Sequence, residues 1–249
     1  MQLLVDIGNT SIKWALRNPA AADLSGFGAA MHGGALPLDL LAVWDELDGI
    51  DAVIAASVGP GPVKNAVTDV CQARWGIAPR WIATRAEAQG VRFAYAEPSR
   101  LGVDRFLALI ATHRRLAGQG SAAPALIVDA GTAITYDLLA PAGRHLGGLI
   151  LPGMKLMRDS LLAGTQIPRY EPIDADLSWA TDTGEAIAAA SIQAPAALAE
   201  RLYHRLQQQT GIAPKLLLTG GDAERLAAAI ELPAECVPDL VLQGLAALA

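Results

Sequence analysis

Cysteine is scarce in this chain, which has only Cys71 and Cys236 among its 249 residues. The two lie far apart and outside any Cys-x-x-Cys pair, so the sequence indicates neither a disulfide framework nor a zinc site. The four histidines are equally scattered along the chain: His32, His113, His145 and His204. We therefore expect each histidine to be a packing or surface residue rather than a metal ligand.

Positive charge is also scarce, because the chain has 19 Lys and Arg residues and 25 Asp and Glu residues, which gives a net charge of −6. The pI is near 5.2 and no cluster of Lys and Arg is present, so the sequence does not indicate a basic surface that would bind a nucleic acid. No apolar run is long enough to span a bilayer, and no signal-peptide pattern is present. The expectation is a cytoplasmic protein without a nucleic-acid or membrane partner.

Two common nucleotide-binding motifs are missing as well. No Gly-x-x-x-x-Gly-Lys-Ser/Thr sequence is present, which argues against a P-loop kinase, and no Gly-x-Gly-x-x-Gly follows a predicted strand as a dinucleotide site requires. The composition is 52% hydrophobic, with 24 glycines and 15 prolines spread along the chain. It predicts a compact globular protein, and the length suits one large domain or two smaller ones, of which we favour two.

The first sixteen residues, MQLLVDIGNTSIKWAL, carry the most informative local pattern. An apolar run leads to Asp6, a tight turn follows at Gly8 and Asn9, and alternating residues then resume, which predicts a β-hairpin. Gly8 lets the backbone approach a ligand, residues 9–11 offer hydrogen-bond donors, and Lys13 adds a positive charge behind them. These groups can cradle a phosphate while Asp6 holds a metal ion, although an ordinary hairpin with a polar turn has the same pattern.

A second polar segment, 95–105, leads into the apolar run 106–111 and puts Asp104 at the start of a predicted helix. Aspartate is a favoured N-cap, so helix capping alone explains the residue. Gly102 and Arg105 favour a different interpretation, because a carboxylate beside a fixed cation and an approachable backbone can accept a proton from an alcohol. Both interpretations stay open at this point.

The opening motif returns in the middle of the chain, after the linker-like stretch 118–124. Val-Asp-x-Gly recurs at Asp129 and Gly131, 123 residues after its first occurrence, again between an apolar run and an alternating strand. Repetition of a carboxylate at a strand end is a stronger signal than either copy alone. We expect two similar α/β halves, 1–120 and 121–249, facing one another across a cleft that contains both turns.

Two further features concern secondary structure. Residues 51–58 read as a buried strand that Gly59-Pro60-Gly61-Pro62 ends sharply. Asp182 and Thr183 are good capping residues ahead of a long helical region, which Pro195 should kink or divide.

In combination, these segments resemble the type III pantothenate kinases, within the superfamily of actin, Hsp70 and the sugar and acetate kinases. The resemblance extends in order over nearly the whole chain and rests on these segments: Asp6-Ile-Gly-Asn-Thr10 with Lys13, Ser57-Val58, Tyr95, Leu101-Gly-Val-Asp-Arg105, Asp129-Ala-Gly-Thr132, Gly147-Gly148 with Pro152-Gly153, Thr183 and Thr219-Gly-Gly221. It implies an α/β fold of two ribonuclease-H-like halves and a homodimer. It also implies ATP-dependent phosphorylation of the pantothenate 4′-hydroxyl, the first step towards coenzyme A.

The resemblance also implies a role for each matching residue. The ATP site would comprise Asp6, Ile7, Gly8, Asn9, Thr10, Ser11, Ile12, Lys13 and Thr132. The pantothenate site would comprise Tyr95, Gly102, Val103, Asp104, Arg105 and Thr183, with Thr183 a candidate contributor from across the dimer. Asp6 would coordinate Mg²⁺, Asp129 would bind a monovalent cation such as K⁺ or NH₄⁺, and Asp104 would be the proton acceptor.

One segment departs from the family pattern, because Ala180-Thr181-Asp182 stands where relatives commonly have Gly, a basic residue and Asn before the threonine. Two alternative functions remain. One is a small-molecule kinase of the same superfamily that acts on another alcohol or carboxylate. The other is a nucleotide-binding regulator without turnover, against which the presence of both Asp104 and Arg105 argues.

Overall fold

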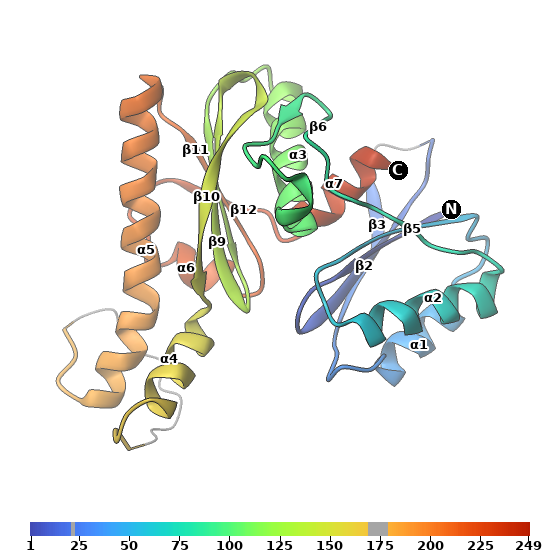
Figure 1. The fold of residues 1–249 in the computed structure, drawn as a ribbon, viewed down its shortest axis with the longest axis horizontal. Helices are drawn as coiled ribbons and strands as arrows, with labels where there is room; N and C mark the ends of the chain where they lie inside the picture. Colours follow the sequence, from blue (N-terminus) through green and yellow to red (C-terminus); the bar gives the residue numbers. More distant parts are fainter. Residues whose placement is uncertain (21–22, 169–178) are drawn as a thin grey trace. The chain divides into compact units, whose positions relative to one another are not determined.

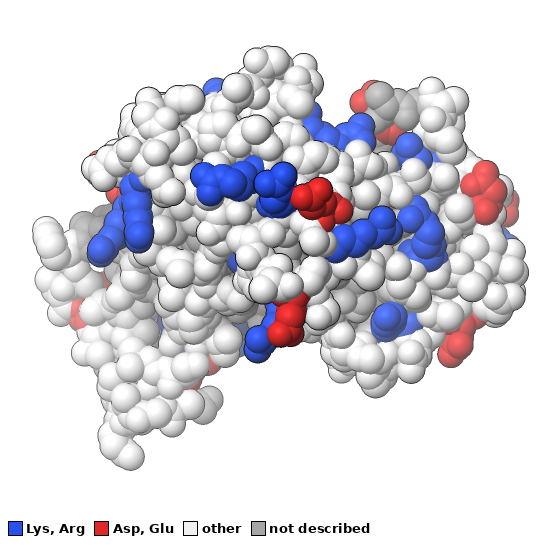
Figure 2. All heavy atoms as spheres, turned by 45° about the horizontal axis from the view of Figure 1, so that its top comes forward, with Lys and Arg blue, Asp and Glu red and all other residues white. Residues whose placement is uncertain are grey.

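The computed structural model describes residues 1–20, 23–168 and 179–249, and their contacts divide the chain into two compact units (Figure 1). The first unit comprises Met1–Arg114 together with Asp239–Ala249, and the second comprises Arg115–Pro238. Within the described ranges, no helix is both long and apolar enough to cross a membrane. Figure 2 shows basic and acidic side chains in small separate groups on one face, with uncharged atoms between them.

The sheet of the first unit is built around the strand that opens the chain. Its strands lie in the order β3-β2-β1-β4-β5, and β1 pairs antiparallel with β2 and parallel with β4. Leu3, Leu4 and Val5 are fully buried because β1 has a strand on each side and apolar cover on its faces. The elements are β1 Gln2–Ile7, β2 Ser11–Arg17, β3 Leu24–Met31, α1 Leu38–Asp45, β4 Ala52–Ser57, α2 Gly61–Trp75 and β5 Arg80–Trp81.

The second unit repeats this strand order. Its strands lie in the order β12-β11-β8-β9-β10, with β8 antiparallel to β9 and parallel to β11. In both units the first strand therefore lies between its hairpin partner and the fourth strand, so the sequence repeat extends to the sheet topology. The strands are β8 Ala125–Ala130, β9 Ala133–Ala140, β10 Arg144–Pro152, β11 Lys215–Thr219 and β12 Ala234–Cys236.

Helix α5 packs on the second sheet, where it contacts β8 and β9, and it also contacts α4 (Figure 1). Its buried residues Ile192, Ala196 and Ala199 share a core with Leu126 and Tyr136 of the sheet. The remaining elements of this unit are η2 Pro141–Gly143, α4 Met154–Ala163, α5 Thr183–Thr210 and α6 Ala223–Ala227.

Pro195 lies inside α5 and does not divide it. A proline in a helix interior removes one N–H donor and costs roughly 3 kcal/mol. Pro195 is buried, however, and the Tyr136 hydroxyl donates a hydrogen bond to its carbonyl at 2.9 Å. Burial of neighbouring apolar side chains, each worth about 1.5–3 kcal/mol for a large residue, offsets the cost of the proline and keeps the helix continuous.

Helix α7 belongs to the first unit, whereas the division expected from the sequence grouped residues 121–249 together. The helix contacts β1, β2 and β4. Its C-terminal carbonyls, at Ala247 and Leu248, accept hydrogen bonds from Arg80, Gln89 and Arg114, which belong to the same unit. The remaining elements are β6 Glu87–Ala88, β7 Val91–Arg92, η1 Pro98–Arg100, α3 Val103–Gly118 and α7 Leu240–Leu248.

Asp182 is the N-cap of α5, as predicted, and its carboxylate accepts hydrogen bonds from the N–H groups of Gly184 at 2.7 Å and Glu185 at 3.3 Å. Asp182→Ala removes both acceptors and is expected to lower the free energy of unfolding by about 0.5–2 kcal/mol, measured by urea denaturation. Asp182→Asn keeps an accepting oxygen and should lose much less. Equal losses in both variants, or none in the alanine variant, would contradict a stabilising cap.

Candidate functional site

The turn between β1 and β2 brings together the first group of predicted site residues. Gly8 donates its N–H to the Ser11 carbonyl at 2.9 Å, which closes the turn and leaves Asn9 and Thr10 exposed. Asp6 is only 9% exposed and lies directly opposite Lys13 in the antiparallel register. Because directly opposed residues extend to the same face of a sheet, this carboxylate and this ammonium group lie on one side of the hairpin.

The segment that follows β4 supports this turn. The N–H groups of Val58 and Gly59 both donate to the Ile7 carbonyl, at 2.9 and 3.1 Å. A Cβ at Gly59 would overlap the carbonyl oxygen of Gly8, so only glycine lets the two backbones approach this closely. The sequence pattern identified Gly59 as a strand terminator, and its contact with the turn becomes visible only when β4 is paired with β1.

His32 is the site-lining residue that the sequence analysis missed, since it was expected to be an ordinary packing or surface residue. It follows β3, is 7% exposed, and places its Nε2 atom 3.0 Å from the Gly8 carbonyl oxygen. Its backbone N–H donates to the Thr10 carbonyl at 2.9 Å. The pairing of β3 with β2 brings this residue to the turn, and the sequence around it has no motif that would have indicated the contact.

The turn between β8 and β9 is the counterpart in the second unit. Gly131 donates its N–H to Ala133 at 3.0 Å, and the Gly153 N–H donates to the Thr132 carbonyl at 2.9 Å. A Cβ at Gly153 would overlap the carbonyl oxygen of Gly131. The start of α4 is therefore packed directly against the backbone of the predicted Asp129–Thr132 loop.

Gly220 also packs against the backbone that leads into this second turn. It follows β11 and has a φ of +94°, a conformation that residues with a side chain rarely adopt. A Cβ there would lie 2.5 Å from Asp129 Oδ1 and would overlap the Ala130 carbonyl. Gly220 therefore confines the end of β8 from β11, the strand parallel to β8, much as Gly59 confines the first turn from the segment after β4, the strand parallel to β1.

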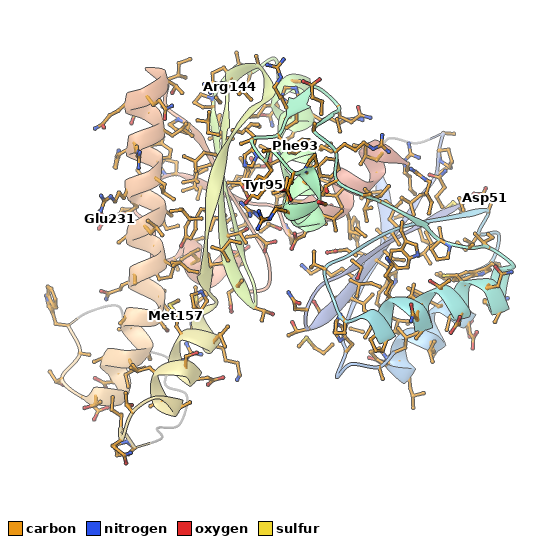
Figure 3. The ribbon with its side chains drawn as sticks, viewed as in Figure 1. Asp51, Phe93, Tyr95, Arg144, Met157 and Glu231 are labelled. Carbon is orange, nitrogen blue, oxygen red and sulfur yellow. The ribbon has the colours of Figure 1, made fainter. Side chains whose placement is uncertain are left out.

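A third group of predicted site residues lies at the start of α3. Arg105 is 5% exposed, its Nη1 donates to the Tyr95 hydroxyl at 2.9 Å, and its guanidinium carbon lies 5.7 Å from the centre of the Tyr95 ring. Phe93 stacks on Phe106 of α3 with ring centroids 4.6 Å apart, and Figure 3 shows Phe93 and Tyr95 beside this helix. The aromatic contact holds the segment that carries Tyr95 against α3.

Asp104 is the second residue of α3 and is partly buried. Its Oδ1 atom accepts a hydrogen bond from the Arg105 N–H at 2.7 Å, and a Cβ at Gly102 would lie 2.5 Å from the same oxygen. The carboxylate therefore accepts from one of the first N–H groups of the helix, but Asp104 lies inside the first turn rather than at the predicted N-cap position, and it stands beside the backbone of Gly102. Val103 is buried at the first position of the helix.

Thr183 belongs to a different group from Tyr95 and Asp104. It is the exposed first residue of α5 in the second unit, directly after the capping Asp182. Tyr95 and Asp104 belong to the first unit. The structure thus brings Tyr95, Gly102, Asp104 and Arg105 together within one unit and leaves Thr183 at a helix start in the other.

Metal binding at Asp6 or Asp129 would depend on oxygen atoms from other sources. Among the residues that the structure describes, no three His, Cys, Asp or Glu side chains are grouped so that they could hold an ion. A single carboxylate next to a turn expected to bind phosphate nevertheless suits Mg²⁺, which is usually held by one or two carboxylates together with substrate phosphates and water. Asp6, at a strand end beside the exposed Asn9 and Thr10, fits that requirement.

Neither cysteine offers a reactive thiolate for covalent catalysis. Burial raises the pKa of the Cys71 thiol to about 12. Burial, the charge of Glu224 and a hydrogen bond to Glu224 raise the pKa of Cys236. A thiol with a raised pKa is protonated and a weak nucleophile near neutral pH, so neither cysteine is a candidate nucleophile.

Comparison with known proteins gives consistent results. The chain matches the type III pantothenate kinase family over residues 2–205. It is 38% identical to a type III pantothenate kinase of Nitrosococcus oceani over 253 residues, which cover 100% of this chain and 94% of that protein. It is also 38% identical to a type III pantothenate kinase of Azoarcus sp., covering 100% of this chain and 90% of that protein.

Similar solved structures identify the fold. A Sinorhizobium meliloti protein assigned as a 2-dehydro-3-deoxygalactonokinase has a TM-score of 0.59 at 14% identity. The superposition covers 99% of this chain and 97% of that protein's chain. A glucokinase from an Antarctic psychrotroph has a TM-score of 0.52 at 14% identity, covering 99% of this chain and 98% of its own. These likenesses, with the order of five strands that the two mixed sheets share, confirm the predicted α/β fold with two like halves.

The contact between Gly59 and Gly8 can be tested by adding a single methyl group. Gly59→Ala places a Cβ where the Gly8 carbonyl oxygen lies, so we expect displaced amide NMR signals for residues 8–11 and a loss of about 1–3 kcal/mol in unfolding free energy. Gly61→Ala is the matched control, because a Cβ there meets nothing within 4 Å. Unchanged signals in the Gly59 variant would show that the turn does not depend on this contact.

Proposed function

The chain belongs to the type III pantothenate kinase family, and on that premise we propose how its residues transfer a phosphoryl group from ATP to pantothenate. Its activity is the phosphorylation of pantothenate in coenzyme A biosynthesis. Phosphoryl transfer needs positioning and charge neutralisation more than covalent catalysis. The observation that carries the assignment of roles is the equivalent placement of Asp6 and Asp129 at the ends of the first strands of two like sheets.

The turns after these strands bind the phosphates of ATP in this proposal. The exposed backbone of Asn9 and Thr10 supplies N–H donors, and Lys13 supplies positive charge on the same face as Asp6. Thr132 contributes from the second turn. The full ATP-binding set is Asp6, Ile7, Gly8, Asn9, Thr10, Ser11, Ile12, Lys13 and Thr132.

Two cations complete the charge balance. Asp6 would hold Mg²⁺, which supplies positive charge to the phosphates when it is bound. Asp129 would hold a monovalent cation, K⁺ or NH₄⁺, and the absence of a side chain at Gly220 leaves room for its carboxylate. The contribution of this chain is to present the two carboxylates on supported turns.

Pantothenate is bound by the group at the start of α3. The hydrogen bond from Arg105 to Tyr95 holds a buried guanidinium, which anchors an anionic part of the substrate or the transferring phosphoryl group. Gly102 and Val103 contribute backbone beside it, and Asp104 takes the proton from the attacking hydroxyl.

We also infer a cytoplasmic homodimer, with Thr183 contributing to the pantothenate site across the dimer. Exposed apolar side chains in the second unit support an association surface: Leu149 and Ile150 on β10, and Leu156 and Leu161 on α4. A cluster of exposed large apolar side chains is typical of a protein–protein interface. The two described units correspond to the two ribonuclease-H-like domains in this proposal.

An ATP-consumption assay with and without pantothenate tests the function. We expect ADP formation that requires both pantothenate and Mg²⁺. ADP formation with a different small alcohol or carboxylate, and not with pantothenate, would favour another kinase of the superfamily. Nucleotide binding without any turnover would favour a regulatory protein.

The role of Asp129 predicts a dependence on the monovalent cation. Replacing K⁺ by Na⁺ is expected to lower kcat/KM for ATP about tenfold or more, because a site that fits K⁺ binds the smaller, more strongly hydrated Na⁺ weakly and is then left without its positive charge where negative charge accumulates. Asp129→Asn should be slow in both salts and insensitive to the exchange. If the wild-type enzyme works equally well in Na⁺ and K⁺, Asp129 is only a structural copy of Asp6.

The Asp104→Asn variant distinguishes a catalytic role of Asp104 from a capping role. Asp104→Asn retains an oxygen that can accept from the Arg105 N–H but cannot take a proton, so kcat should fall by about a hundredfold to ten-thousandfold. The melting temperature and the KM for pantothenate should stay close to wild type. Asp69→Asn, at an exposed position of α2, is the matched control and should be fully active. Normal turnover by the Asp104 variant would leave capping as the only role of this residue.

A further inference from the structure

His32 is the one buried histidine in contact with the proposed phosphate-binding turn, among the residues that the structure describes. Its Nε2 atom lies 3.0 Å from the Gly8 carbonyl oxygen, while Gly59 packs against the same oxygen. The Gly8 carbonyl is therefore held between an imidazole and a glycine backbone. None of the proposed roles in phosphoryl transfer uses His32.

The contacts of the ring assign its protonation state. The Gly34 N–H points to Nδ1 at 3.4 Å, so Nδ1 has to be an acceptor there. A carbonyl oxygen can only accept, so Nε2 has to carry the hydrogen that it donates to Gly8. Both contacts are satisfied together only by the neutral imidazole with its hydrogen on Nε2.

The hydrogen bond to the Gly8 carbonyl also determines where the next amide points. The peptide bond between Gly8 and Asn9 is trans, because the described residues contain no cis peptide. In a planar trans peptide the C=O and the N–H point in opposite directions. With the Gly8 carbonyl directed at His32, the Asn9 N–H is directed away from it, and no described residue accepts a hydrogen bond from that N–H.

We propose that His32 is a positioning residue, which orients the Gly8–Asn9 peptide so that the exposed Asn9 N–H donates to a phosphate oxygen of ATP. The inference rests on the proposed role of this turn in binding the ATP phosphates. Pre-orientation matters because a backbone donor that is already aimed at the phosphate loses less entropy when the nucleotide binds. His32 itself touches neither substrate.

His32 contacts the turn through both its backbone and its side chain, and substitutions can test the side-chain contact separately. The bond from the His32 N–H to the Thr10 carbonyl is made by the backbone, so it persists when the side chain is changed. His32→Leu removes only the imidazole hydrogen bonds, whereas His32→Gln retains a side-chain N–H that can reach the Gly8 carbonyl. His204→Leu, at an exposed histidine of α5, is the matched control.

Steady-state kinetics in the full-length enzyme, at saturating Mg²⁺, provides the main test. We expect His32→Leu to raise the KM for ATP about threefold to tenfold, the range set by loss of one ordinary hydrogen bond, and to leave the KM for pantothenate unchanged. His32→Gln should restore most of the loss, and the His204 variant should match wild type. An unchanged KM for ATP, or equal rises in both KM values without rescue by glutamine, would overturn the proposal.

Two further measurements keep the inference separate from the proposed function. Calorimetry with a non-hydrolysable ATP analogue should show the same weakening in His32→Leu, whatever the acceptor substrate is. Nitrogen NMR of the wild-type ring should show the neutral form with hydrogen on Nε2, and hydrogen on Nδ1 would overturn the proposal even if the leucine variant does not fold. Absence of pantothenate-dependent ADP formation in the wild type, with analogue binding still weakened by the variant, would instead reject the function alone.

Discussion

Close contact between backbones at the ends of parallel strands is the constraint on which the candidate site depends. Gly59 meets the carbonyl of Gly8 in the first unit, and Gly220 meets Ala130 in the second, at distances that no Cβ would permit. Each turn is then closed by its own hydrogen bond, from Gly8 to Ser11 and from Gly131 to Ala133. A turn confined in this way presents its amides without having to be ordered by the ligand, which lowers the entropic cost of binding.

The same arrangement determines where charge can be placed. Asp6 is the next-to-last residue of the central strand β1 and is only 9% exposed. The antiparallel register then brings Lys13 to the same face. In the proposed function the carboxylate would hold a metal ion and the ammonium group would neutralise phosphate charge, two tasks that phosphoryl transfer requires.

The proposed pantothenate site at the start of α3 relies on a different kind of order. Arg105 is almost fully buried, and a buried guanidinium is costly unless its donors are bonded. Tyr95 provides such a bond, and Phe93 secures the Tyr95 segment by stacking on Phe106. A cation fixed in this manner can discriminate an anionic substrate by geometry as well as charge, because the guanidinium fork cannot reorient freely.

The sequence by itself determined the repeated Val-Asp-x-Gly turns, the buried strands before them, the cap at Asp182 and the family resemblance, because all of these are encoded by short-range pattern and local residue preference. It did not reveal that α7 belongs to the first unit, that α5 runs through Pro195, or that His32 and Gly59 hold the Gly8 carbonyl. These features join residues that are distant in the chain, or balance a local cost against burial elsewhere. Only the pairing of β1 with β4, and of β2 with β3, brings Gly59 and His32 to the Gly8 carbonyl, and no short window of sequence contains both sides of either contact.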